Sequence, residues 1–188
     1  MDIKKNQKLI IRFMTEVNVQ SVTNFINLVE TEFKNEVKFF RILISSPGGM
    51  VDPGLSAFNY LKGLPVYIET VNFGAVDSIS VMLFCAGKNR ICVPNARFIL
   101  HDVMRLIPPH TQPSFISEVQ LKEWIDALRV DRTNIAKVIS DTTGKPLEEI
   151  KKLIIDGKVL NAEEAKRMGL VTTISENIIE EGIRIINI

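Results

Sequence analysis

The chain has 188 residues, with 23 lysine and arginine residues against 22 aspartate and glutamate residues. Its 46% hydrophobic and 24% charged residues are typical of one globular domain with a buried core. A net charge of +1, without a local basic cluster, argues against nucleic-acid binding. No apolar run is long enough to cross a bilayer and no signal peptide is evident. We expect a single domain over residues 1–188, located in the cytoplasm and without membrane contact.

The first hundred residues alternate between strand and helix patterns. Apolar runs predict strands at 8–14, 39–45, 66–71, 90–93 and 96–100. Helical spacing predicts helices at 19–34, 52–63 and 77–85, with Asp52 as N-cap and Pro53 as first residue of the second. Alternation of this kind favours an α/β fold with a parallel sheet and crossover helices.

The second half of the chain is more helical. A long helix is predicted over 114–141, capped by Ser114, and another begins at Pro146 and ends at Ile155. Asn161 and Glu164 form a capping box for a short helix that ends at Gly169. Residues 170–174 and the apolar tail are predicted strands.

Residues of types that take part in catalysis follow three of the predicted strands. Gly48 and Gly49 follow the strand at 39–45, Ser78 follows the strand at 66–71, and His101 follows the strand at 96–100. The carboxyl ends of parallel strands meet at one edge of a sheet, so these residues should lie together. Exposed backbone N–H groups, a hydroxyl and an imidazole are the parts that acyl transfer needs. Taken singly, each has a commoner structural explanation as a turn, a helix N-terminal serine or a hydrogen-bonded histidine.

Four segments, in order, resemble the proteolytic subunit of the Clp protease. They are LISSPGGMVDPGLSAFNYL, GAVDSISVMLFCAG, VPNARFILH and the pair TGKPLEEIKKLI and LNAEEAKRMGLV, and the resemblance runs from about Leu9 to Ile174. It implies the Clp/crotonase-like fold, a layered α/β spiral in which the long helix projects as a handle.

The resemblance also implies the roles of individual residues. Ser78 corresponds to the nucleophile and His101 to the general base. The backbone N–H groups of Gly49 and Ile79 correspond to the oxyanion hole, which stabilises charge that develops in the tetrahedral intermediate.

The third member of the triad is less well defined. A gapless match back from Leu160 puts Gly157 where the family has its aspartate, and Asp156 lies one residue earlier. A one-residue bulge would restore Asp156, which is our candidate; an exposed loop carboxylate is the alternative. Asp102 adjoins His101, but neighbouring strand residues point to opposite faces, so its side chain is a poor partner for the ring.

Three further departures from the family pattern are visible. The segment before the first strand is short, which argues against the Clp-type ATPase partner that the family otherwise implies. DVMRLIPPHTQPS, after the histidine, lacks the family's glycine-rich stretch. Asp77 stands where the family prefers a small residue, and it could either bind the helix N-terminus or disturb the field at Ser78.

The favoured interpretation is a serine endopeptidase that cleaves peptides or unfolded proteins through an acyl-enzyme in a homo-oligomeric ring. Two histidines and two cysteines without ligand spacing predict neither a metal nor another cofactor. One alternative is a catalytically silent ring subunit, which would leave Ser78 unlabelled by a serine-hydrolase probe. The other is a crotonase-type acyl-CoA enzyme, which would bind acyl-CoA tightly. The sequence does not indicate the physiological substrate, cleavage preference or ring size.

Overall fold

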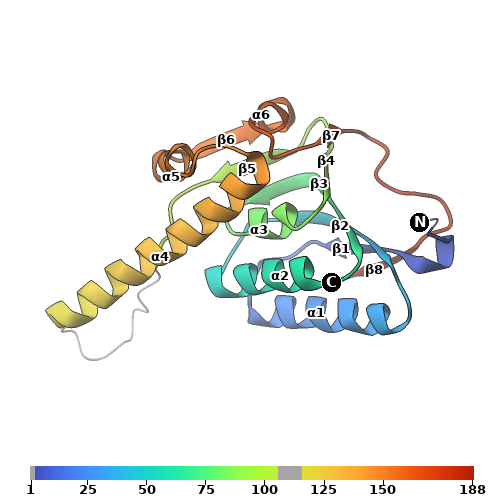
Figure 1. Ribbon diagram of the computed structural model, residues 1–188, viewed down its shortest axis with the longest axis horizontal. Coiled ribbons are helices and arrows are strands. Elements are labelled where there is room, and N and C mark those ends of the chain that lie inside the picture. The colour runs from blue at the N-terminus through green and yellow to red at the C-terminus, as the bar shows by residue number, and fades with distance from the viewer. Residues whose placement is uncertain (1–2, 106–115) are drawn as a thin grey trace.

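The computed structural model describes residues 3–105 and 116–188 and contains one mixed sheet flanked by helices (Figure 1). The strand order is β6-β5-β3-β2-β1-β8, and β4 branches from β3 and pairs with β7. Every pairing is parallel except the antiparallel β5–β6 pair. The parallel core of the sheet agrees with the strand–helix alternation of the sequence.

The elements follow in chain order. They are η1 (Lys5–Gln7), β1 (Lys8–Phe13), α1 (Val19–Lys34), β2 (Phe39–Ser46), α2 (Val51–Gly63), β3 (Tyr67–Asp77), α3 (Ser80–Cys85), β4 (Asn89–Cys92), β5 (Arg97–Leu100), α4 (Glu118–Thr143), α5 (Leu147–Asp156), β6 (Lys158–Asn161), α6 (Ala162–Met168), β7 (Thr173–Ile174) and β8 (Arg184–Asn187).

The long strand β3 organises the site. Its first half pairs with β4 and its second half, residues 75–77, pairs with β5. The carboxyl ends of β2, β3 and β5 therefore lie next to one another, because β3 pairs with both of the other strands. β6 then runs antiparallel along the outer side of β5 and closes this part of the sheet.

Apolar side chains are buried on both faces of the sheet. The larger cluster lies under the helices and includes Phe13, Phe25, Phe84 and Phe98. The smaller cluster, around Ile10 and residues of β2, β3 and β4, is covered in part by the segment that leads into β8. Both faces of a parallel sheet are usually covered in this way, which explains the nearly continuous apolar runs of its strands.

Several element boundaries differ from the predictions. α2 begins at Val51 with Met50 as its N-cap, so Asp52 and Pro53 lie inside its first turn. β3 continues to Asp77, well past residue 71, and α3 begins only at Ser80. The predicted cap Ser114 lies outside the described residues, and Ser117 caps α4 by accepting from Gln120 N–H.

The later elements agree more closely. The capping box of Asn161 and Glu164 is confirmed, as is the left-handed Gly169 at the end of α6. The tail forms β8 and pairs with β1. β6 was not predicted, and only two residues of the 170–174 segment form a strand.

Among the helices that the structure describes, α4 alone extends far from the rest of the fold (Figure 1). It has 26 residues, of which only Ala136 and Ile139 are buried. Within residues 3–105 and 116–188, no helix combines the length and the apolar character needed to cross a membrane.

Candidate active site

Ser78 directly follows β3 and has a positive φ of 57°. A left-handed backbone is uncommon for a residue other than glycine and persists where the surrounding structure enforces it. Here Ser78 N–H donates to the carbonyl of Ile99 on β5 at 2.7 Å. The hydrogen bond joins the turn at Ser78 to the strand that ends just before His101.

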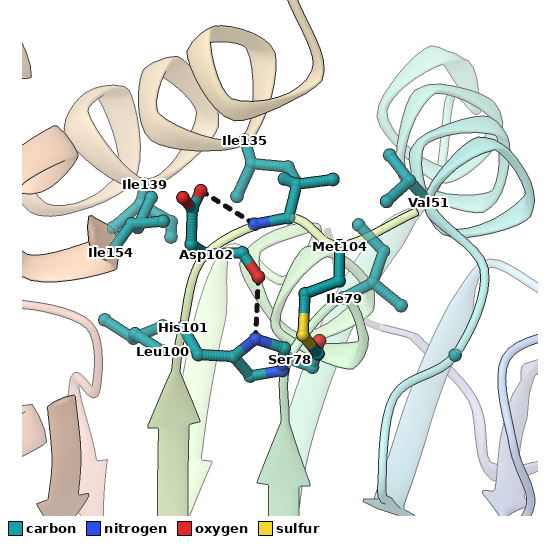
Figure 2. Close-up of a pocket in the computed structure, with 12 residues that line it drawn as sticks. Val51, Ser78, Ile79, Leu100, His101, Asp102, Met104, Ile135, Ile139 and Ile154 are labelled. Carbon is teal, nitrogen blue, oxygen red and sulfur yellow. Dashed lines mark hydrogen bonds between the residues drawn. The ribbon is translucent and has the colours of Figure 1, made fainter. Parts of the chain in front are cut away.

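His101 follows the last residue of β5 and lines the same pocket as Ser78. Its Nδ1 lies 2.7 Å from the backbone carbonyl of Asp102, and Figure 2 shows the other ring nitrogen on the side that faces Ser78. Between the described side chains of Ser78 and His101 no hydrogen bond is formed. Such bonds are often long without substrate and shorten in the complex.

Two residues that line this pocket have backbone N–H groups without an acceptor in the described part of the chain. In the described part of the chain, neither Gly49 N–H nor Ile79 N–H donates a hydrogen bond, although both residues line the pocket with Ser78. Unbonded N–H donors beside a serine hydroxyl are suited to stabilising an oxyanion. Gly49, Ser78, Ile79 and His101 thus line one pocket, and their catalytic roles stay predictions.

Gly48 allows the backbone after β2 to lie close to the turn that carries Ser78. It has a φ of 92°, and a Cβ at this position would lie 2.6 Å from Ser78 Cβ and 2.7 Å from the Asp77 carbonyl oxygen. No other residue type fits between these atoms without a shift of the turn that carries Ser78.

The pocket itself is small and largely aliphatic. Its volume is about 90 Å³, and Val51 of α2, Ile135 and Ile139 of α4, and Ile154 of α5 contribute to its wall (Figure 2). The reactive groups therefore adjoin a surface that suits an apolar side chain.

Asp77 is neutralised by a cation. Its Oδ2 accepts from Arg97 of β5 at 2.9 Å, and its side chain is only 11% exposed. α3 has no side-chain cap, and Ser80 Oγ donates to the Asp77 carbonyl. Asp77 is thus an ion-pair partner across the sheet, and its side chain does not cap α3.

Asp156 is exposed and is the last residue of α5. Within the described residues it forms no hydrogen bond with His101, whose Nδ1 contacts a backbone carbonyl instead. The β5–β6 pairing runs from Arg97–Asn161 to Leu100–Lys158 without a bulge. Continued one step past the last pair, the register puts Gly157, and not Asp156, opposite His101. The role of Asp156 as triad member stays a prediction.

Sequence reasoning missed Arg132. Its guanidinium binds the Asp102 carboxylate twice, at 2.6 and 2.7 Å. The hydrogen bond from Arg132 is the largest cause that holds the pKa of the Asp102 carboxyl below its ordinary value. No local pattern could indicate this pair, because 30 residues separate its members and α4 alone brings them together.

Comparisons with known proteins identify relatives of the chain. The Clp protease family model matches residues 3–178. The chain is 31% identical over 142 residues to proteolytic subunit 3 of the ATP-dependent Clp protease from Rhizobium meliloti, which covers 74% of this chain and 69% of the relative. The corresponding subunit from Rhizobium etli is 32% identical over 136 residues, with coverage of 71% and 66%.

A solved structure shows the same fold. A variant of ClpP1 from Listeria monocytogenes superposes with a TM-score of 0.75 at 25% identity and with 92% of each chain covered. The predicted layered α/β fold of the Clp/crotonase type is thereby confirmed. Because the family model covers nearly the whole chain, this protein belongs to the Clp protease family.

Proposed function

We propose that the protein is a serine endopeptidase that hydrolyses peptide bonds through an acyl-enzyme. The observation that carries this proposal is the meeting of Ser78 and His101 in one pocket with two unbonded backbone N–H groups, those of Gly49 and Ile79. Family membership supports a peptidase, and the geometry supports a serine mechanism for it.

The proposed reaction has two halves. His101 takes the proton of Ser78 Oγ through its free nitrogen as the oxygen attacks the peptide carbonyl. The N–H groups of Gly49 and Ile79 stabilise the negative oxygen of the tetrahedral intermediate. His101 then gives the proton to the leaving amine, and a water molecule activated by the same ring hydrolyses the acyl-enzyme.

The wall of the pocket favours apolar substrates. Val51, Ile135 and Ile154 offer aliphatic contacts beside Ser78. A volume of about 90 Å³ suits a side chain of moderate size at the residue before the cleaved bond. We therefore expect peptides or unfolded proteins with leucine or methionine at this position to be cleaved faster than those with charged residues.

We further propose that copies of the chain form a homo-oligomeric ring through α4. The outer half of this helix exposes apolar side chains, among them Leu121 and Ile125, that have no cover within the described part of the subunit. The two Rhizobium relatives are named as subunits of an ATP-dependent protease, so a Clp-type ATPase is the partner to test. The two buried free cysteines fit a reducing compartment such as the cytoplasm.

Covalent labelling tests the assignment of Ser78. A fluorophosphonate probe should label the wild type and should fail to label Ser78→Ala, with peptide hydrolysis lost by several orders of magnitude. Ser56→Ala is the matched control, because Ser56 is exposed on α2 and should leave both readouts unchanged. Labelling that persists in Ser78→Ala would contradict the proposal.

The labelling experiment and a calorimetric measurement together separate the alternatives. A wild type that takes up no probe and cleaves no peptide would favour the silent ring subunit. Tight binding of an acyl-CoA in calorimetry, in a protein without peptidase activity, would favour the crotonase-type enzyme.

A further inference from the structure

We propose that Asp102 and Arg132 are positioning residues that hold the His101 ring in the tautomer that the reaction needs. The inference rests on the proposed peptidase function and concerns how its base is oriented. The backbone carbonyl of Asp102 takes the place that a carboxylate occupies in a Ser-His-Asp triad.

The first step of the argument is the hydrogen bond of the ring. A carbonyl oxygen can only accept, so the 2.7 Å contact requires a proton on His101 Nδ1. In a neutral imidazole the other nitrogen, Nε2, is then an acceptor. This is the tautomer that can take the Ser78 proton, and it requires the carbonyl of Asp102 to keep its direction.

The second step is what fixes Asp102. Its carboxylate accepts two hydrogen bonds from Arg132. It accepts a third, at 2.8 Å, from Val103 N–H (Figure 2). Arg132 lies on α4, a helix that packs against α5 and α3. Asp102 is thereby bound to α4, and the same helix lines the pocket through Ile135 and Ile139.

The third step is the lack of a competing carboxylate. Continued one step past its last pair, Leu100–Lys158, the β5–β6 register puts Gly157, which has no side chain, opposite His101. Over the described residues, the one hydrogen bond of the His101 ring is the bond to the Asp102 carbonyl. The tautomer is thus set by backbone whose position depends on the Asp102–Arg132 pair.

Arginine suits this task better than lysine. A guanidinium binds both carboxylate oxygens at once and fixes the plane of the carboxylate, whereas an ammonium acts as a point charge. Since Arg132 and Asp102 are only 27% and 32% exposed, the pair is partly shielded from solvent.

Kinetics of the full chain test the proposal. Arg132→Met should lower kcat by roughly 10- to 100-fold and slow fluorophosphonate labelling equally, with KM within about twofold, because the ring loses its alignment and the pocket keeps its shape. Arg132→Lys should recover part of the loss. Arg129→Met is the matched control, since Arg129 is an exposed arginine nearby on α4 whose ion pair is with Asp126.

A double-mutant cycle shows whether Asp102 and Arg132 act on kcat as one interacting pair or independently of each other. Asp102→Asn combined with Arg132→Met should lose little more than Arg132→Met alone, because both changes disrupt one interaction. Losses that multiply in the double variant would overturn the proposal. So would a kcat within about twofold of wild type in Arg132→Met, with Ser78 labelling intact. If Arg132→Met does not fold, Arg132→Lys against Arg129→Lys gives the same comparison.

A spectroscopic readout is independent of activity. The chain has two histidines, so ¹⁵N-histidine-labelled His110→Gln protein reports His101 alone. Solid-state ¹⁵N spectra should show a protonated Nδ1 and an unprotonated Nε2 at neutral pH, and Arg132→Met should reduce this population. A ring with a protonated Nε2 and a bare Nδ1 in the wild type would overturn the inference even where peptidase activity is present. A wild type that shows the Nδ1–H tautomer but is not labelled at Ser78 would instead contradict the proposed function.

Discussion

At the residue scale, the position of Ser78 depends on a neighbour that has no role in the proposed chemistry. Gly48 combines a positive φ with a contact so close that a methyl group would meet Ser78 Cβ at 2.6 Å. We predict that Gly48→Ala lowers the rate of fluorophosphonate labelling at least tenfold. The unfolding free energy should fall by about 1–3 kcal/mol from backbone strain, to which the clash adds.

Gly63→Ala is the control for this prediction. Gly63 is the last residue of α2, and a Cβ there would meet no atom within 4 Å. Alanine at this position should leave labelling unchanged and should keep or slightly raise the melting temperature. Equal labelling rates for the two variants would show that Gly48 does not shape the site.

A second prediction at this scale concerns Asp156. A carboxylate that stabilises the imidazolium contributes about three to four orders of magnitude to turnover. Because the structure puts a backbone carbonyl on Nδ1 and leaves Asp156 exposed, we expect Asp156→Asn to keep turnover within about tenfold of wild type. His101→Ala, measured with the same peptide, should abolish it. A thousandfold loss in Asp156→Asn would restore Asp156 as the third triad residue.

The residues of the candidate site were predictable to different degrees. Ser78, His101 and Gly49 follow predicted strands, and the parallel sheet brings their carboxyl ends together, so pattern alone places them at one edge. Arg132 was not predictable, because its contact with Asp102 depends on the course of α4 over the sheet. Which of Asp156 and Gly157 lies nearer His101 depends on the register of β6. The sequence of β6 has no apolar alternation that would predict a strand.

At the element scale, the main discrepancy is the length of β3. The sequence after residue 71 contains Asn72 and Gly74, which usually mark the end of a strand. In the structure the Asn72 side chain accepts from Gly74 N–H and donates to the Arg97 carbonyl. These bonds keep polar residues within the sheet, and they arise only once β5 lies beside β3.

The third prediction uses the two thiols as reporters of the elements that carry them. Cys85 ends α3 and Cys92 ends β4, and both are buried. Burial raises the pKa of Cys85 to about 11 and that of Cys92 to about 12. Since the thiolate is the reactive form, neither thiol should react with iodoacetamide at pH 8 in the folded protein.

The sign of the pH effect follows from these shifts. Raising the pH toward 11 should increase the alkylation of Cys85 before that of Cys92, provided that the fold persists. Both should react at pH 8 in denaturant, where each thiol returns to its ordinary pKa. Rapid alkylation of either residue at pH 8 under native conditions, detected by mass spectrometry, would show that its element opens.

At the scale of the whole molecule, one face of α4 is covered by its own subunit at one end and exposed at the other. Six residues of α4 at spacings of three and four share a face, as expected for a helix that packs along its length. They are Leu121, Ile125, Leu128, Arg132, Ile135 and Ile139. The last two lie against the pocket of their own subunit, whereas Leu121 and Ile125 are 46% and 48% exposed. An apolar stripe that continues past the subunit's own core indicates a second protein surface, which we take to be another copy of the chain.

This arrangement leads to the last prediction. Leu121→Asp and Ile125→Asp change residues that the isolated subunit leaves half exposed, so each should alter the stability of the monomer by no more than about 0.5 kcal/mol. In an interface the same change buries an unpaired charge and costs about 3–5 kcal/mol, enough to dissociate the ring. Multi-angle light scattering should therefore show a large wild-type assembly and folded monomers or small fragments of the ring for both variants. Gln120→Asp, an exposed polar position on the same helix, should assemble like the wild type. A wild type that is a stable monomer, or Asp variants that assemble normally, would show that the outer half of α4 is not the contact between subunits.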